Sequence, residues 1–245
     1  MNTRDLGGIV TQTGHKVIQG RVLRSDALNA LTGEDVATLG GLGLRTVIDF
    51  RSPQEVAVAG PDRLPPGAGS VPLPILAGNL DEFFAGGPGK LRELLGDGKG
   101  ERFMLGINRQ FVADPAHREQ FGRALRLIAD RGRQPVLFHC STGKDRAGWM
   151  TAVLLTALGV SRDQVMTDYL ATNEYIWPAY ERKLRDGADP DLLPLLRPLL
   201  VQDPAYIDAA FDEVTVRYQS FGHFLDGGLG FTDADVAQLR RSLLG

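Results

Sequence analysis

Cys140 and Arg146 lie six residues apart and bracket a segment whose residue types suit the binding of an anion. The thiolate form of a cysteine is a nucleophile, and an arginine guanidinium can donate two parallel hydrogen bonds to one phosphate group. Ser141, Thr142 and Gly143 stand between them, so consecutive backbone N–H groups can surround the same phosphate. One short loop would then supply both an attacking group and the donors that hold a phosphate ester.

The segments on either side of this loop predict a strand before it and a helix after it. Pro135 to Phe138 is a continuous apolar run, as expected of a strand buried on both faces. Ala147 to Leu158 has a helix-forming composition, and Gly159 follows where a left-handed residue would end the helix. The positive end of the helix dipole would therefore meet the loop, where it favours a bound anion and an ionised Cys140. We expect inorganic phosphate to bind there.

The loop from His139 to Gly148, HCSTGKDRAG, resembles the Cys-x5-Arg signature of protein tyrosine phosphatases, and is most similar to the bacterial group with a Lys-Asp pair inside the loop. The resemblance implies a cysteine-dependent phosphatase that cleaves phosphotyrosine through a phosphocysteine intermediate, without cofactor or metal. It gives catalytic roles to Cys140 and Arg146. It gives substrate-binding roles to the residues between and beside them: Ser141, Thr142, Gly143, Lys144 and Ala147. The Gly-Lys pair is also similar to that of phosphoinositide phosphatases, so phosphoserine, phosphothreonine and lipid headgroups join phosphotyrosine as candidate substrates.

The general acid that protonates the leaving oxygen has two candidates, Asp145 and Asp49. Familiar tyrosine phosphatases carry this acid in a Trp-Pro-Asp segment ahead of the cysteine, whereas here Trp177-Pro178 follows the cysteine and precedes Ala179. Asp145 is favoured, because a carboxylate beside a phosphate is repelled unless it is protonated or used in the reaction. A short helix expected between Thr32 and Gly41 lies between two predicted strands, which implies parallel pairing and places Asp49 on the same edge of the sheet as Cys140. Asp49 could therefore assist proton transfer, hold Arg146, or only pair with Arg51.

Three further segments resemble the same bacterial family: residues 2–8, 47–52 and 167–173. A small hairpin is expected within residues 9–24, with its turn at Gln12 to His15. In the first segment, we expect Arg4 and Asp5 to form an ion pair that braces this hairpin rather than to contact substrate. His139 precedes the cysteine on a strand, so its side chain would point to the other face and hydrogen-bond the loop backbone.

Composition excludes several other classes of protein. The net charge of −3 gives no general attraction to nucleic acid, and the one cysteine rules out intramolecular disulfides and four-thiolate zinc sites. No run of about eighteen apolar residues predicts a transmembrane segment, and the first residues have no apolar signal core. We therefore expect a cytoplasmic protein, with non-classical secretion as the open alternative.

The pattern along the chain predicts an α/β fold, with a mixed, largely parallel central sheet flanked by helices, in one domain over residues 1–245. A strand is expected over residues 44–50, and two helices should meet at Asp114-Pro115. The stretch from Gly60 to Gly100 is rich in glycine and proline and is expected to be loop, with short helical turns at 80–84 and 90–95. Prolines from Pro178 onward should break the following helical stretch. Residues 76–107 and 174–215 are candidate lid segments.

Two other functions compete with the phosphatase. A thiol-dependent redox enzyme of arsenate-reductase type also uses Cys-x5-Arg, but normally needs further cysteines, which this chain lacks. An inactive phosphate-binding module would not need both Cys140 and Arg146 intact. The physiological substrate and the oligomeric state are not specified by the sequence.

Overall fold

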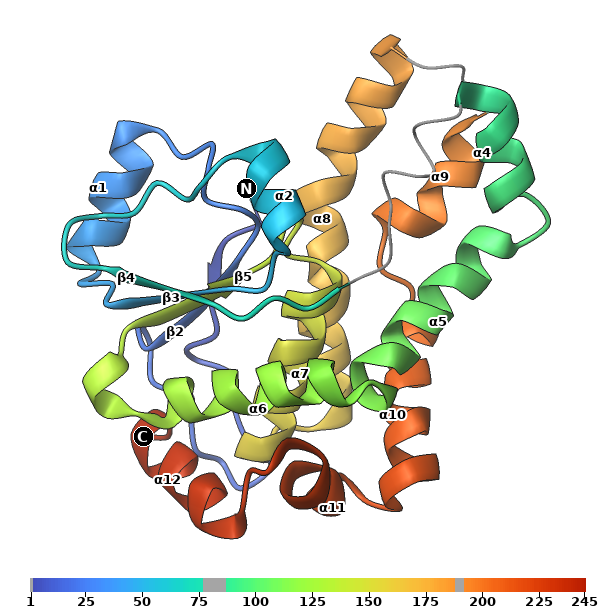
Figure 1. Ribbon diagram of the computed structural model, residues 1–245. Coiled ribbons are helices and arrows are strands. Elements are labelled where there is room, and N and C mark those ends of the chain that lie inside the picture. Colours follow the sequence, from blue (N-terminus) through green and yellow to red (C-terminus); the bar gives the residue numbers. More distant parts are fainter. Residues whose placement is uncertain (1, 77–86, 188–191) are drawn as a thin grey trace.

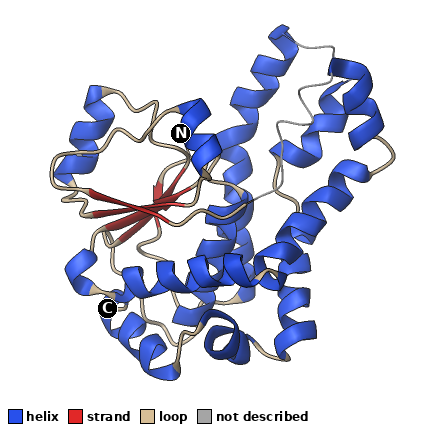
Figure 2. Ribbon diagram, in the orientation of Figure 1, coloured by secondary structure: helices blue, strands red, loops and turns tan. Residues whose placement is uncertain are grey.

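The computed structural model describes residues 2–76, 87–187 and 192–245. A central sheet is surrounded by helices, which gives the mixed α/β architecture that the sequence predicts (Figures 1 and 2). The strands are β1 (Arg4–Asp5), β2 (Val22–Ser25), β3 (Thr46–Asp49), β4 (Gly69–Pro72) and β5 (Val136–His139). The helices before β5 are α1 (Gly33–Gly41), α2 (Pro53–Ala59), α4 (Gly87–Leu95), α5 (Lys99–Ala113), α6 (Pro115–Ala129) and the 3-10 turn η1 (Arg131–Arg133). Those after it are α7 (Asp145–Leu158), α8 (Arg162–Gly187), α9 (Leu193–Leu200), α10 (Pro204–Tyr218), α11 (Phe221–His223), the π-helical turn η3 (Phe224–Gly228) and α12 (Asp233–Leu243).

The strand order β1-β2-β5-β3-β4 places β5 at the centre of the sheet. Only the β1–β2 pair is antiparallel; β2, β5, β3 and β4 run parallel to one another. The last residues of three strands therefore lie in register, with His139 opposite Ser25 on one side and Asp49 on the other. Chemistry placed after β5 thus lies at the carboxyl edge of the sheet, where ligands bind in open α/β folds.

Alternating side chains of the central strands fill two separate hydrophobic cores. Leu137 and Val47 face a small core beneath α1, whereas Phe138 and Ile48 face the large core formed with α5, α6, α7, α10 and α12. Figure 1 shows α1 and α2 on one side of the sheet and α6 and α12 on the other. A strand buried on both faces must be apolar at every position, which explains the continuous apolar run seen in the sequence before the loop.

Two helix boundaries that the sequence predicts are confirmed. Helix α5 ends and α6 begins at Asp114-Pro115, where the Asp114 side chain accepts a hydrogen bond from the N–H of Ala116. Helix α7 ends at Gly159, which has the left-handed φ of +88°. The small hairpin expected from residue 9 onward is formed in part: Val10 and Lys16 make an antiparallel bridge, and the N–H groups of Thr11 and Val17 donate to the carbonyl oxygens of His15 and Ile9.

Two expectations about proline- and glycine-rich segments are wrong. Strand β4 lies inside the stretch expected to be loop; its Gly-Ser-Val-Pro sequence has little strand propensity, and parallel pairing with β3 forms it instead. Helix α8 continues through Pro178, where a break was expected. Helix α8 also packs on α7 and α9, and these contacts can offset the backbone hydrogen bond that a proline removes. Of the short helical turns expected between residues 80 and 95, the first lies outside the described residues.

The described parts of the two candidate lid segments pack on each other. Helix α4 contacts α5 and α9, and α9 also contacts α8, in the part of the molecule that extends away from the sheet in Figure 1. Their buried leucines, Leu91, Leu95, Leu196 and Leu199, belong to the same hydrophobic cluster as the strands. Whether these helices move as a lid stays a prediction.

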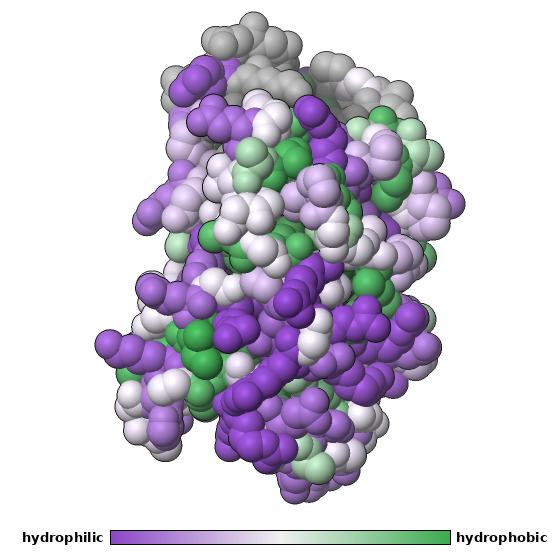
Figure 3. Space-filling view, turned by 90° about the vertical axis from the view of Figure 1, so that its left-hand side faces the viewer, coloured by the Kyte–Doolittle hydropathy of each residue, from purple (hydrophilic) through white to green (hydrophobic). Residues whose placement is uncertain are grey.

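The face in Figure 3 carries a broad hydrophilic band across its lower half. A surface cavity of about 430 Å³ lies beside β4 and α6 and is lined by Arg123, Arg126 and Arg133 among others, and no residue of the cysteine loop lines it. None of the described helices is long and apolar enough to cross a membrane.

Candidate active site

The segment between β5 and α7 forms a tight loop that carries the cysteine. Cys140 directly follows the central strand and is 1% exposed. Gly143 has a φ of +66°, and a Cβ atom there would lie 2.5 Å from the carbonyl oxygen of Ser25. Only glycine allows so close an approach of the loop to β2 in this conformation.

The loop backbone leaves a set of N–H groups without protein acceptors. Across the described part of the chain, the N–H groups of residues 141–144 donate to no protein atom. Backbone N–H groups without protein acceptors at the start of a helix suit the binding of an anion. These are the donors that the sequence predicts will surround a phosphate, and phosphate binding by this loop, called the cradle below, stays a prediction.

Arg146 stands at the start of α7 and is held by a carboxylate. Its two Nη atoms lie 2.7 and 2.6 Å from the two oxygens of Glu55, and Nη1 also donates to the carbonyl oxygens of Phe50 and Ile75, at 3.2 Å each. A two-pronged contact of this kind fixes the plane of the guanidinium. The side chain that would hold phosphate oxygens is thus already oriented.

Glu55 also contacts the loop and its own helix. The Ser141 hydroxyl donates to Glu55, and the N–H of Ser52 donates to the other carboxylate oxygen at 2.8 Å. Burial alone would raise the pKa of Glu55, but hydrogen bonding and charge attraction from Arg146, with further hydrogen bonds from Ser141 and Ser52, lower it to about 2. The carboxylate is therefore ionised across the physiological range and acts as the counterion of Arg146.

Sequence reasoning missed Glu55. The signal was present, because Ser52-Pro53-Gln54-Glu55 directly follows a predicted strand and has the S-x-x-E form of a capping box. The structure confirms that box at the start of α2. What the pattern could not show is that the same carboxylate reaches Arg146, 91 positions away.

Lys144 and Asp145 form an ion pair within the loop. Lys144 Nζ lies 2.7 Å from Asp145 Oδ1, and the two side chains are 3% and 15% exposed. A cation and a carboxyl group are therefore available beside the cradle, and the carboxyl group retains some contact with solvent.

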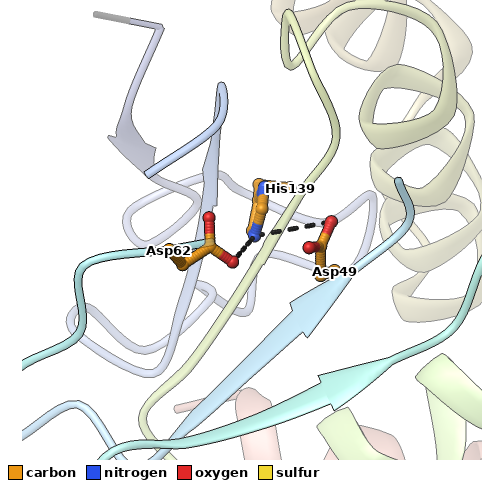
Figure 4. A group of neighbouring side chains, drawn as sticks. All are labelled: Asp49, Asp62 and His139. Carbon is orange, nitrogen blue, oxygen red and sulfur yellow. Dashed lines mark hydrogen bonds and ion pairs between the residues drawn. The ribbon is translucent and has the colours of Figure 1, made fainter. Parts of the chain in front are cut away.

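Asp49 takes part in a buried charge network on the neighbouring strand end. Arg51 donates to both of its oxygens, at 2.8 to 3.1 Å, and also to Asp62 at 2.8 Å. His139 Nε2 lies 3.0 Å from Asp62 and 3.8 Å from Asp49, so the ring stands between the two carboxylates (Figure 4). Burial would raise the pKa of Asp62, but His139 and Arg51 lower it.

Three residues of this network have side chains of the types that bind metal ions, and the ion pairs explain why they lie close together. Single ligand atoms of Asp49, Asp62 and His139 lie within 4.8 Å of one another. The Arg51 guanidinium already binds oxygens of both carboxylates, so it supplies the positive charge that these oxygens require. His139 Nδ1 lies 3.2 Å from the carbonyl oxygen of Cys140, as expected for a histidine that supports the loop backbone.

The expected ion pair between Arg4 and Asp5 is not formed. Arg4 instead pairs with Asp168 on α8, at 2.9 Å, while the Asp5 carboxylate accepts from the N–H groups of Gly7 and Gly20. The second carboxylate oxygen of Asp168 binds the fully buried Arg24 at 2.5 Å. Arg4 and Asp168 thus join residues 2–8 to residues 167–173, and the hydrogen bond from Arg146 to the Phe50 carbonyl oxygen joins residues 47–52 to the start of α7.

The fold and the site define a class of protein: a central parallel strand leads into a cysteine-containing anion loop, and a held arginine follows at the helix start. The sequence profile of the tyrosine phosphatase family matches residues 1–245. The chain is 32% identical to the triple specificity protein phosphatase PtpB of Mycobacterium tuberculosis, over 100% of both chains. It is also 32% identical to a Cupriavidus necator protein whose name assigns it provisionally to the tyrosine-protein phosphatases, over 98% of this chain and 84% of that one.

The chain therefore belongs to the tyrosine phosphatase family and is a protein-tyrosine phosphatase. A Nostoc commune tyrosine-protein phosphatase is 27% identical over 63% of this chain and 49% of its own. Two crystal structures of Pseudomonas aeruginosa TpbA, one of a variant in complex with pTyr, match at 20% identity with TM-scores of 0.32, and the one with pTyr covers 63% of this chain and 70% of its own. This structural likeness is too low to support an argument.

Proposed function

We propose that this phosphatase transfers the phosphoryl group of its substrate to Cys140 and then to water, and that it accepts phosphotyrosine together with phosphoserine, phosphothreonine or phosphoinositide monoesters. The observation that carries the proposal is the cradle itself. Residues 140–146 bring together the thiol of Cys140, the N–H groups of residues 141–144 that donate to no protein atom in the described structure, and the guanidinium of Arg146, which Glu55 holds. The Mycobacterium tuberculosis relative is named a triple specificity phosphatase, which supports a range of substrates.

The reaction runs in two steps, transfer of the phosphoryl group to Cys140 and its hydrolysis. The Cys140 thiolate attacks phosphorus, an S–P bond forms while the P–O bond breaks, and Asp145 gives its proton to the leaving oxygen. A water molecule then attacks phosphorus, Asp145 takes back a proton, and the S–P bond breaks to release inorganic phosphate and the thiolate. Arg146 and the loop N–H groups hold the three other oxygens, whose negative charge is stabilised in both transition states.

Asp145 is the proposed acid because its surroundings permit proton transfer. Its carboxyl group lies in the loop itself and is 15% exposed, and its one side-chain partner in the described structure is Lys144. Asp49 is less suited, because both of its oxygens bind Arg51. Ser141, Thr142, Gly143, Lys144 and Ala147 are the proposed substrate-binding residues.

The rival reactions have less support. A redox enzyme of arsenate-reductase type normally uses further cysteines, and the chain has one. A single reactive thiol with no partner suits a reducing compartment, which supports a cytoplasmic location for the activity.

Hydrolysis of p-nitrophenyl phosphate, in chelator and without added thiol, tests the proposal. We expect the wild-type protein to turn over, and Cys140→Ser to lose turnover while still binding phosphate, because the cradle remains. Arg146→Ala should lose both. Phosphate binding by Cys140→Ser shows that the variant is folded; appreciable hydrolysis by it would disprove the mechanism. Comparison of kcat/KM over a panel of phosphopeptides and phosphoinositides then ranks the substrates.

A further inference from the structure

The carbonyl groups of the cysteine loop are all engaged on the side away from the cradle. Consecutive carbonyl oxygens from Cys140 to Lys144 each have a donor in the structure. The Cys140 carbonyl oxygen accepts from His139 Nδ1, that of Ser141 from the N–H of Ala27, and that of Thr142 from Asn2 Nδ2. The Gly143 carbonyl oxygen accepts from both Asn2 Nδ2 and Arg24 Nη2, and that of Lys144 accepts from the N–H of Gly148. A peptide group whose oxygen is fixed on one side must point its N–H to the other. The outer hydrogen bonds therefore decide where the N–H groups point.

Two of these donors come from distant side chains that are buried. Asn2 is 1% exposed, and its amide nitrogen lies 3.1 Å from the carbonyl oxygens of both Thr142 and Gly143. Arg24, on β2, is 0% exposed and donates to Gly143 at 2.8 Å. These contacts fix the two peptide groups in the middle of the loop, where no regular element would hold them.

The orientation of both donors depends on one carboxylate. Asp168 on α8 accepts from Arg24 Nη1 at 2.5 Å and from Arg4 Nε at 2.9 Å. Arg4 Nη1 in turn donates to the side-chain oxygen of Asn2 at 2.6 Å, so the amide nitrogen of Asn2 must face the loop. Thr172 accepts from both arginines, at 3.1 and 3.5 Å.

The charges of this group also favour an anion in the cradle. Two guanidinium groups against one carboxylate leave these three side chains with a net charge of about +1 behind the loop; Arg24 is fully buried and the Arg4 side chain is 12% exposed. Burial lowers the pKa of Arg24, and attraction to Asp168 and to a Cys140 thiolate opposes that shift. Burial would raise the pKa of Asp168, and the two arginines lower it. The carboxylate is therefore the group that allows both cations to stay.

We propose that Asn2, Arg4, Arg24 and Asp168 form a positioning network that holds the loop carbonyls outward and thereby sets the affinity of the cradle for phosphate. This inference rests on the proposed function, because it assigns the loop N–H groups to phosphate. None of the four residues needs to touch the substrate. The chain thus uses its first residues and a helix after the loop to hold the loop's shape.

The affinity for inorganic phosphate tests the network without turnover. It is measured by calorimetry on folded protein with any affinity tag at the C-terminus, so that Asn2 is undisturbed. Asn2→Ala removes two hydrogen bonds to the loop and should raise the Kd of phosphate about tenfold, since each bond contributes roughly half of that effect. Asp168→Asn leaves the two arginines facing each other and should raise the Kd further. KM for p-nitrophenyl phosphate should rise in parallel.

Asp208→Asn is the control for removing a carboxylate that pairs with an arginine. Asp208, on α10, forms a 2.5 Å ion pair with Arg162 at the start of α8, and it does not contact the loop. Its phosphate Kd should equal that of the wild-type protein. A Kd for Asn2→Ala within twofold of the wild type, or an equal change in Asp208→Asn, would overturn the network. If Asp168→Asn does not fold, Asn2→Ala decides alone. Repeating the titration in the Cys140→Ser background separates this test from the proposed chemistry, because phosphate binding there needs no nucleophile.

Discussion

Replacement of Glu55 by glutamine tests whether this carboxylate is the counterion of Arg146, the arginine proposed to bind phosphate. The pKa of Glu55 is held at about 2, below the ordinary value of 4.5, and this difference corresponds to about 3 kcal/mol of favourable interaction with the ionised form. The side chain is 31% exposed, so screening by solvent reduces the expected loss of unfolding free energy to about 2 kcal/mol at pH 7. If the transition state loses the same free energy of about 2 kcal/mol because Arg146 is no longer held, kcat/KM falls about 30-fold.

The contribution of Glu55 to the free energy of unfolding should fall as the pH is lowered. Because the pKa in the folded protein lies below that in the unfolded chain, the contribution of Glu55 is complete above about pH 4.5 and is lost as the pH falls toward 2. Urea unfolding of wild type and Glu55→Gln should therefore differ by about 2 kcal/mol at pH 7 and by about half of that at pH 3. Glutamine can still cap α2, so the loss reports the charge.

Asp35→Asn is the control for this experiment. Asp35 occupies the same N3 position in the capping box of α1, without any contact to Arg146. It should leave kcat/KM for p-nitrophenyl phosphate unchanged. A stability difference between wild type and Glu55→Gln that stays constant from pH 7 to pH 3, or unchanged kcat/KM in the variant, would refute the counterion role.

Three further outcomes are expected from the loop. Asp145→Asn should slow hydrolysis of phenyl phosphate much more than that of p-nitrophenyl phosphate, whose leaving group needs little protonation; equal losses on the two esters would remove Asp145 from the acid role. Brief peroxide treatment should inactivate Cys140 in a way that added thiol does not reverse, because the chain has no second cysteine, and inorganic phosphate should slow it; inactivation at the same rate with phosphate would contradict a thiolate in the phosphate site. Gly143→Ala should weaken phosphate binding by tenfold or more, because its Cβ would meet Ser25, whereas Gly14→Ala, at a φ of +85° in open space, should not; equal binding by the two variants would contradict the tight approach of the loop.

Local patterns were enough to predict the centre of the molecule. The apolar run before Cys140 and the helical composition after it define β5 and α7, because a buried strand and a long helix leave clear periodic signals. The carboxyl-edge position of Asp49 beside the loop also followed, since a helix between two strands favours parallel pairing.

The contacts that complete the site could not be predicted, because they join residues far apart in the chain. Arg4 and Asp168 are 164 positions apart, and Glu55 and Arg146 are 91 apart. An ionised side chain in a sequence does not reveal which opposite charge the fold brings near, so Arg4 was assigned to its neighbour Asp5. Strand β4 was missed for a related reason: its pairing with β3, rather than its own residues, makes it a strand.

Trapping of the phosphorylated enzyme tests the central claim most directly. Wild-type protein is mixed with p-nitrophenyl phosphate, quenched in acid within the first turnover and digested, and the peptide that contains Cys140 is analysed by mass spectrometry. The mechanism predicts one added phosphoryl group on the sulfur of Cys140, absent from the Cys140→Ser protein treated in the same way. A wild-type enzyme that turns over with no phosphoryl group on Cys140, or with the group on Ser141, would contradict the mechanism.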